Sequence, residues 1–184
     1  LKALALIYFA AFLSIAVQIP CLAGPDGILP FAEFLQQAYE QRGYQAFLYL
    51  PSVFWIDSSN LALQLVAYAG CLFSVVLFFG YWRTTMLVLM FIAYLSLFHA
   101  GQMFMTFQWD TLLMEAGFLA IFLTSGPSHL VIFLYHWLLF RLRFMSGVSK
   151  IASDDPAWAN LTTLNYYFET QPLPHAGAWY FHQL

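Results

Sequence analysis

The sequence predicts an all-α membrane protein, a polytopic bundle of about five transmembrane helices with interfacial helices and an extramembrane C-terminal segment. Three observations predict this class. Of the 184 residues, 62% are hydrophobic and 8% are charged, whereas soluble domains carry about 25% charged residues. Long apolar runs alternate with short polar turns. Aromatic residues make up 20% of the chain, and Trp and Tyr suit the membrane–water boundary. A chain of this size cannot bury so much apolar surface, so lipid must cover the rest.

Charge and cysteine content exclude two further classes. The net charge is -3, which supplies no basic patch for nucleic acid. The two cysteines, Cys21 and Cys71, do not make a disulfide framework, because Cys71 lies midway along an apolar run and Cys21 follows another. We therefore expect no nucleic-acid partner and no disulfide.

The first predicted span covers residues 3–19, close to the 20 or so apolar residues that cross a bilayer core, and Pro20 is expected to end it. The sequence GPDG at 24–27 predicts a turn. Residues 30–42 then alternate apolar and polar side chains at helical spacing. This helix either lies in the membrane interface or packs on the bundle. A second short interfacial piece is expected over 44–56, where Pro51 interrupts an apolar run.

Four further apolar runs complete the expected bundle, at 61–82, 85–105, 109–125 and 129–146. The Asp-Ser-Ser-Asn sequence at 57–60 offers helix N-caps before the first of these runs. An odd number of spans places the two chain ends on opposite sides of the membrane. The loop at 20–60 carries one basic residue, so the positive-inside rule places it outside.

The chain is expected to divide into a transmembrane bundle over 1–146, with its interfacial loop at 20–60, and a membrane-surface segment over 147–184. In the second part, Asp155 precedes Pro156, which predicts an N-cap with proline at the first helical position.

Five ionisable side chains inside predicted helices form a candidate intramembrane charge network: Asp110, Glu115, His136, Arg141 and Arg143. Asp110 is expected at a helix start, where a carboxylate can cap free N–H groups. Glu115 lies deeper, where an unpaired carboxylate costs about 2.5 kcal/mol or more. We expect Glu115 to pair with Arg141 or Arg143; the alternative is that both arginines extend to the lipid headgroups.

The sequence carries no catalytic constellation. It has no metal-ligand spacing such as HxxxH or CxxC, no GxSxG and no glycine-rich phosphate loop. No catalytic residue, metal site or cofactor is therefore predicted, and the sequence leaves enzymatic activity open.

Several blocks in the second half of the chain, taken together, resemble the lipase maturation factor family. These are FQWDTLLMEAGFLAIFL (107–123), WLLFRLRFMSGVSK (137–150), DPAWANLTTLNYYFETQPLP (155–174) and WYFHQL (179–184). The resemblance implies a polytopic membrane protein, a further soluble region after residue 184 and, in animals, an endoplasmic reticulum factor that helps dimeric secreted lipases fold. Asn165-Tyr166-Tyr167 departs from the expected pattern, in which Tyr-His precedes the Glu-Thr-Gln motif. The membrane part of the family also looks distantly similar to vitamin K-dependent carboxylase.

The resemblance favours a membrane-bound folding factor whose partners are lipid and a secreted lipase or other exported client. It implies localisation in the endoplasmic reticulum membrane of a eukaryote or the inner membrane of a bacterium. A possible client-binding or structural surface would then comprise Lys150, Trp158, Tyr167, Glu169 and Gln171.

Two alternatives stay open. A carboxylase-like membrane enzyme would use Glu115, His136, Lys150 and Glu169. A transporter is less favoured, because no inverted repeat is evident.

Overall fold

The computed structural model describes residues 1–126, 128–170 and 176–183, and every regular element in these ranges is helical. It divides into two compact units, Leu1–Tyr135 and His136–Leu184. The α-helices are α1 (Lys2–Ala23), α2 (Phe31–Arg42), α3 (Ala46–Tyr49), α4 (Asn60–Phe79), α5 (Arg83–Gly101), α6 (Gln108–Leu123), α7 (His129–Ala152), α8 (Pro156–Ala159), α9 (Thr163–Thr170) and α10 (Ala176–His182). Three 3-10 turns are η1 (Gly43–Gln45), η2 (Val53–Trp55) and η3 (Gln102–Met105).

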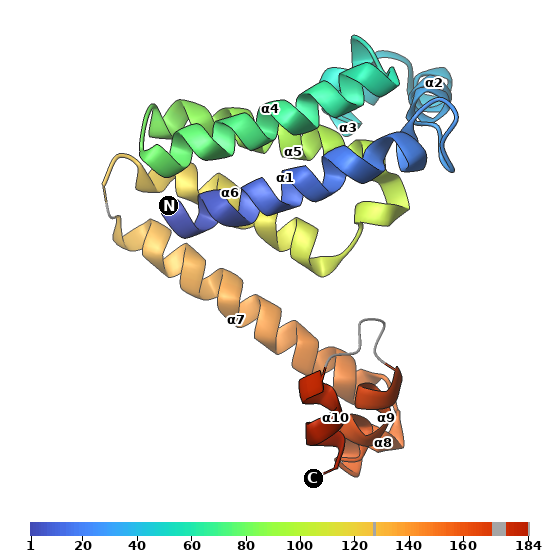
Figure 1. Ribbon diagram of the computed structural model, residues 1–184, viewed down its shortest axis with the longest axis vertical. Helices are drawn as coiled ribbons and strands as arrows, with labels where there is room; N and C mark the ends of the chain where they lie inside the picture. Colours follow the sequence, from blue (N-terminus) through green and yellow to red (C-terminus); the bar gives the residue numbers. More distant parts are fainter. Residues whose placement is uncertain (127, 171–175, 184) are drawn as a thin grey trace. The chain divides into compact units, whose positions relative to one another are not determined.

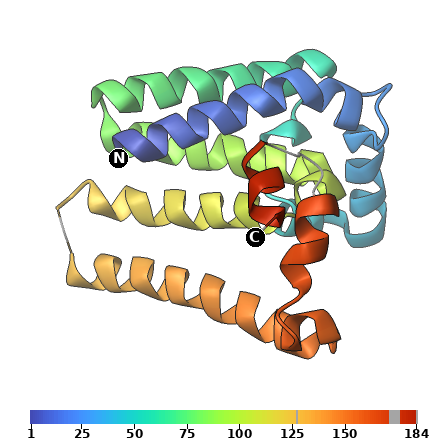
Figure 2. The same ribbon diagram turned by 60° about the horizontal axis from the view of Figure 1, so that its bottom comes forward.

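In the first unit, α1, α4, α5 and α6 lie side by side along their length (Figures 1 and 2). One stripe of α1 recurs at three- and four-residue intervals and is fully buried; it comprises Ala5, Tyr8, Phe12, Ala16, Ile19 and Ala23. The rings of Tyr8, Phe12 and Tyr94 meet at centroid distances of 5.4–5.8 Å. Phe12 also occupies the space that a Cβ at Gly70 would need. Aromatic side chains against small residues therefore set the spacing of α1, α4 and α5.

The membrane bundle is confirmed as a helical assembly. Among the described residues, four segments are long and apolar enough to cross a membrane: Lys2–Ala23, Asn60–Phe79, Arg83–Met105 and His129–Ala152. The other expected span corresponds to α6, whose 16 residues extend about 24 Å against a hydrocarbon core of about 30 Å.

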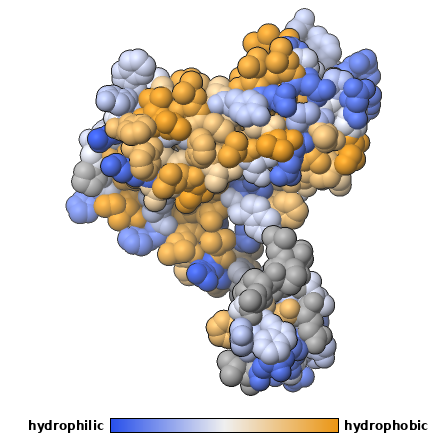
Figure 3. Space-filling model, viewed as in Figure 1, coloured by the Kyte–Doolittle hydropathy of each residue, from blue (hydrophilic) through white to orange (hydrophobic). Residues whose placement is uncertain are grey.

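Apolar side chains cover much of the outside of these helices. Leu6, Ile7 and Val17 of α1 are all more than half exposed, as are Leu65 and Leu72 of α4. In Figure 3 hydrophobic side chains spread over this bundle, and hydrophilic ones gather at the end where α2 lies. A face of this composition is stable only against lipid.

Two helix ends differ from the prediction. Pro20 does not end α1, which continues to Ala23; the Gly24 N–H donates to the Pro20 carbonyl at 3.1 Å. Proline removes one backbone donor, and the last turn tolerates that loss. The last predicted span also does not end at residue 146, because α7 runs to Ala152 through Gly147. A single glycine costs a helix about 1 kcal/mol, too little to stop it.

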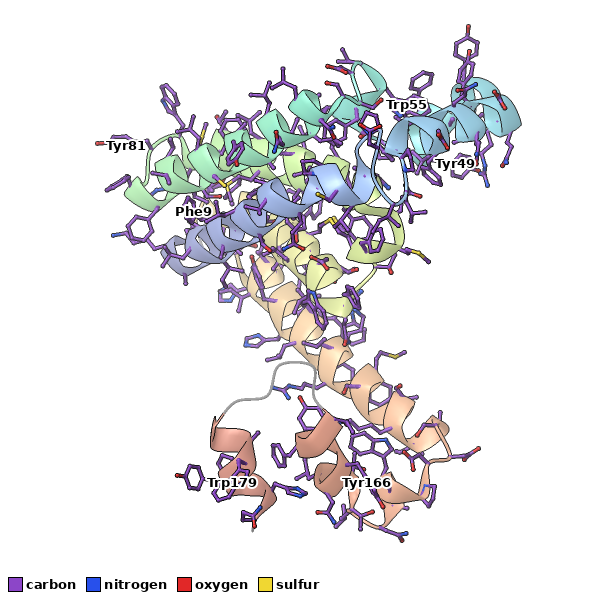
Figure 4. All side chains as sticks on the ribbon, turned by 45° about the vertical axis from the view of Figure 1, so that its right-hand side comes forward. Phe9, Tyr49, Trp55, Tyr81, Tyr166 and Trp179 are labelled. Carbon is purple, nitrogen blue, oxygen red and sulfur yellow. The ribbon has the colours of Figure 1, made fainter. Side chains whose placement is uncertain are left out.

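The loop between α1 and α4 packs on the bundle. Phe31 and Leu35 of α2 are buried together with Phe54 of η2, and the rings of Phe31 and Phe54 meet edge to face at 6.1 Å. Of the two predicted placements for α2, packing on the bundle is therefore correct for the face that carries Phe31 and Leu35. Figure 4 shows Tyr49 and Trp55 near this loop end and Tyr81 at the opposite end of the bundle.

Two hydrogen bonds tie the loop to α5 and η3. The Val53 N–H donates to Ser96 Oγ at 3.1 Å, and Gln102 Nε2 donates to the Leu29 carbonyl at 3.1 Å. The predicted N-cap before α4 is confirmed at Ser59, which accepts from the Ala62 N–H at 3.2 Å.

In its described residues, the second unit contains the rest of α7 and the short helices α8, α9 and α10. The predicted Asp155 cap is confirmed: its carboxylate accepts from the Ala157 N–H at 2.9 Å, with Pro156 in the first turn of α8. Phe168 of α9 stacks on Phe181 of α10 at 6.2 Å. Tyr166 and Trp179 mark these two helices in Figure 4.

Candidate functional site

A polar site of the first unit lies around Asp110, in the first turn of α6. The Tyr94 hydroxyl of α5 donates to Asp110 Oδ1 at 2.7 Å. Tyr94 is 1% exposed, so its ring is fixed by the aromatic core while its hydroxyl reaches the carboxylate. The α6 N-cap is Phe107 and makes no side-chain capping bond, but Asp110 still lies near the positive end of the helix dipole. Sequence reasoning missed Tyr94, because nothing in the local pattern links residues on two different helices.

An open pocket of about 250 Å³ adjoins this carboxylate. It is lined by Ser14 and Gln18 of α1, by Phe107, Trp109 and Asp110 around the start of α6, and by apolar side chains of α1 and η3. Gln18 Nε2 donates to Ser14 Oγ at 3.0 Å. The rings of Phe107 and Trp109 stack at 4.8 Å and 9°. The pocket therefore combines a carboxylate, a hydroxyl, an amide and an aromatic wall.

The five residues of the candidate charge network are distributed over both units. Asp110 and half-buried Glu115 belong to the first unit. His136, Arg141 and Arg143 belong to the second unit, and all three side chains are exposed. The pairing of Glu115 with an arginine thus stays a prediction. Among the described residues, no three His, Cys, Asp or Glu side chains gather as a metal site. Both cysteines are free; Cys71 is buried and Cys21 is exposed.

A second feature of the first unit lies on the loop. Arg42 stacks over the Tyr49 ring at 4.2 Å, and both residues line a shallow pocket of about 290 Å³ between α2 and α3. Three apolar side chains of the same loop, Tyr44, Leu48 and Ile56, are 81%, 84% and 91% exposed. We call these three residues the loop patch. The sequence indicated an interfacial piece over 44–56 but did not separate the buried Phe54 from its exposed neighbours.

The predicted surface of the second unit is described in part. Lys150 Nζ lies 4.8 Å from the centroid of the Trp158 ring, which brings the end of α7 against α8. Tyr167 is more than half exposed, and its ring meets that of Phe168 edge to face at 5.7 Å. The side chain of Glu169 and the whole of Gln171 lie outside the described residues.

Comparison with known proteins gives a consistent result over the full length of the chain. A family model described as the lipase maturation factor transmembrane domain matches residues 1–184. Lipase maturation factor 2 of Xenopus laevis is 39% identical over 198 residues, covering 97% of this chain and 28% of the relative. The human protein of the same name is 36% identical over 211 residues, covering 100% and 30%.

Human lipase maturation factor 1 is 34% identical over 201 residues, covering 99% of this chain and 35% of the relative. The chain thus spans about a third of the length of the curated relatives it matches. No solved structure matches it.

Proposed function

The chain belongs to the lipase maturation factor family, and on this premise we propose that it is the membrane part of a factor that assists the folding of secreted lipases or other exported proteins. The observation that carries the proposal is the family match over residues 1–184. The chain is an integral membrane protein of several helical spans. The client class comes from the names of the relatives, among them human lipase maturation factors 1 and 2.

The loop patch fits such a role because incompletely folded clients expose apolar side chains. Tyr44, Leu48 and Ile56 project from a loop whose inner side is fixed by Phe31 and Phe54. A rigid base with exposed apolar side chains limits the entropy lost when a client binds. In the second unit, Lys150, Trp158 and Tyr167 are proposed as a further client-binding or structural surface, with Glu169 and Gln171 included from the sequence alone.

We further propose the endoplasmic reticulum membrane as the location in a eukaryote, and the inner membrane in a bacterium. The curated relatives named above come from vertebrates, which supports the first assignment. The division into a bundle over 1–146 and a membrane-surface segment over 147–184 is retained as part of the proposal.

Deletion of the gene from cells that carry it tests the proposal directly. We expect the secreted activity of a lipase client to fall while its mRNA level stays constant, and re-expression to restore it. Unchanged secretion of every lipase that the cells export would contradict the proposal.

The role of the loop patch is tested by re-expressing the variant Tyr44→Ser/Leu48→Ser/Ile56→Ser. We expect it to insert normally but restore little lipase activity, because it lacks the apolar contact surface. The matched control replaces Glu33 and Gln41, exposed polar residues of α2, with serine and should restore activity fully. A photo-crosslinker at Leu48 should capture the client; a crosslink to lipid alone would exclude the loop patch as the client site.

A further inference from the structure

We infer that the pocket beside Asp110 binds the ammonium headgroup of a zwitterionic phospholipid. This inference is independent of the proposed maturation function. It rests on what lines the pocket, on where the pocket lies along the helices and on the incomplete hydrogen bonding of one carboxylate.

Among the described residues, the carboxylate of Asp110 accepts one side-chain hydrogen bond, from the Tyr94 hydroxyl at 2.7 Å. An ionised carboxylate offers about four acceptor positions. In the part of the chain that the structure describes, no Lys, Arg or His side chain lines the pocket or is paired with Asp110. A carboxylate on a membrane helix is costly unless a cation or water compensates it. The open side of the pocket is therefore the place from which a cation can approach.

The aromatic wall favours an organic cation. Trp109 is 66% exposed and Phe107 is 49% exposed, and their stacked rings line the same pocket as the carboxylate. Aromatic faces attract ammonium groups through the ring quadrupole, Trp most strongly. The Ser14 hydroxyl and the second N–H of the Gln18 amide are additional donors for the phosphate or ester oxygens of the same lipid.

The pocket lies near the ends of the candidate spans, which is where lipid headgroups meet a membrane bundle. Gln18 is five residues before the end of α1, Asp110 is in the first turn of α6, and Met105 ends the span that begins at Arg83. These helix ends all lie at the loop end of the bundle. Because the pocket opens on a lipid-facing bundle near the end of its spans, a phospholipid is the amine-bearing molecule that reaches it.

The test is a lipid titration of the delipidated full chain in detergent, followed by native mass spectrometry. Phosphatidylethanolamine, phosphatidylcholine and phosphatidylglycerol with identical acyl chains are compared. We expect the two zwitterionic lipids to bind the first site about tenfold more tightly than the anionic one, since only they carry an ammonium group for the carboxylate. Soluble ethanolamine and choline at equal concentration should not displace the lipid, because they lack the acyl chains.

Asp110→Asn should reduce the preference for zwitterionic over anionic phospholipid to about twofold or less, because the amide carries no charge. Trp109→Leu, at an exposed position that tolerates change, should weaken phosphatidylcholine binding about threefold. The matched control Glu33→Gln removes a carboxylate from exposed α2 and should keep the full preference. An undiminished preference in Asp110→Asn or Trp109→Leu, tight binding of phosphatidylglycerol, or displacement by soluble ethanolamine or choline would overturn the inference.

Discussion

The Tyr8 hydroxyl donates a 2.9 Å hydrogen bond to the Leu113 carbonyl and fills the space in which a Cβ at Gly117 would lie. Helices α1 and α6 therefore touch at a point that admits no additional carbon atom. Tyr8 is 1% exposed and is held by the rings of Phe12 and Tyr94, so its hydroxyl cannot move aside freely.

Gly117→Ala is expected to lower the free energy of unfolding by about 1–3 kcal/mol, the usual cost of overpacking a filled core. The measurement is the midpoint of denaturation in detergent micelles, followed by circular dichroism. Gly147→Ala is the matched control, because a Cβ there meets nothing within 4 Å. It should leave stability unchanged or raise it by up to about 1 kcal/mol. Equal destabilisation by the two variants would show that Tyr8 does not restrict position 117.

Tyr94→Phe removes the hydroxyl donor to Asp110 and keeps the ring in the aromatic core. We expect a loss of about 1–3 kcal/mol, because a half-buried carboxylate loses its hydrogen-bond donor. The control is Tyr68→Phe on α4, whose side chain is 49% exposed. A melting temperature of Tyr94→Phe equal to that of Tyr68→Phe would mean that water replaces the lost donor at no cost.

The sequence predicts helices here far better than it predicts where they touch. Hydropathy located the spans, and alternation of polar and apolar residues located α2. The Asp155 cap was predictable because its signal is local. The predicted helix ends at Pro20 and just before Gly147 were wrong. The free-energy cost of one proline or glycine is small compared with the packing and hydrogen bonding of a long helix. Contacts between helices are set by three-dimensional packing, which leaves no periodic signal in one sequence.

In the candidate site, too, a residue could be predicted from the sequence but its contacts could not. Asp110 was identified from its type and position, but its donor Tyr94 is 16 residues away on another helix. The partners in the pocket, Ser14 and Gln18, lie almost 100 residues earlier in the chain. Small polar residues on an apolar helix become informative only when the fold brings them beside a carboxylate.

The predicted pairing of Glu115 with Arg141 is tested by a double-mutant cycle. Glu115→Gln and Arg141→Gln should each destabilise the protein, and the double variant should lose less than the sum, with a coupling of about 1 kcal/mol or more. Stability is measured by denaturation in nanodiscs. A second cycle, with Glu115 and Arg143, gives the coupling energy of the other pair, and the larger coupling identifies the arginine that pairs with Glu115. Strictly additive losses in both cycles would favour the alternative in which the arginines extend to the headgroups.

Ser96 fixes the loop to the bundle, and a comparison with Ser74 isolates that role. Both serines are 1% exposed and both donate to the carbonyl four residues earlier in their own helix, at 2.8 Å. Only Ser96 also accepts a hydrogen bond from outside its helix, from the Val53 N–H at 3.1 Å. Replacing Ser96 with alanine leaves that loop N–H without its acceptor, whereas the same change at Ser74 removes a bond within one helix.

We therefore expect Ser96→Ala to increase amide hydrogen exchange in residues 50–56, and Ser74→Ala to leave it unchanged. The Val53–Ser96 hydrogen bond is part-buried, so its loss costs about 1 kcal/mol, and local opening of the loop relieves that cost. The loop patch should become more mobile as well, because Ile56 follows η2 directly. Faster exchange spread evenly over α4, α5 and the loop would instead indicate global destabilisation, and the Val53–Ser96 hydrogen bond would then not be what holds the loop in place.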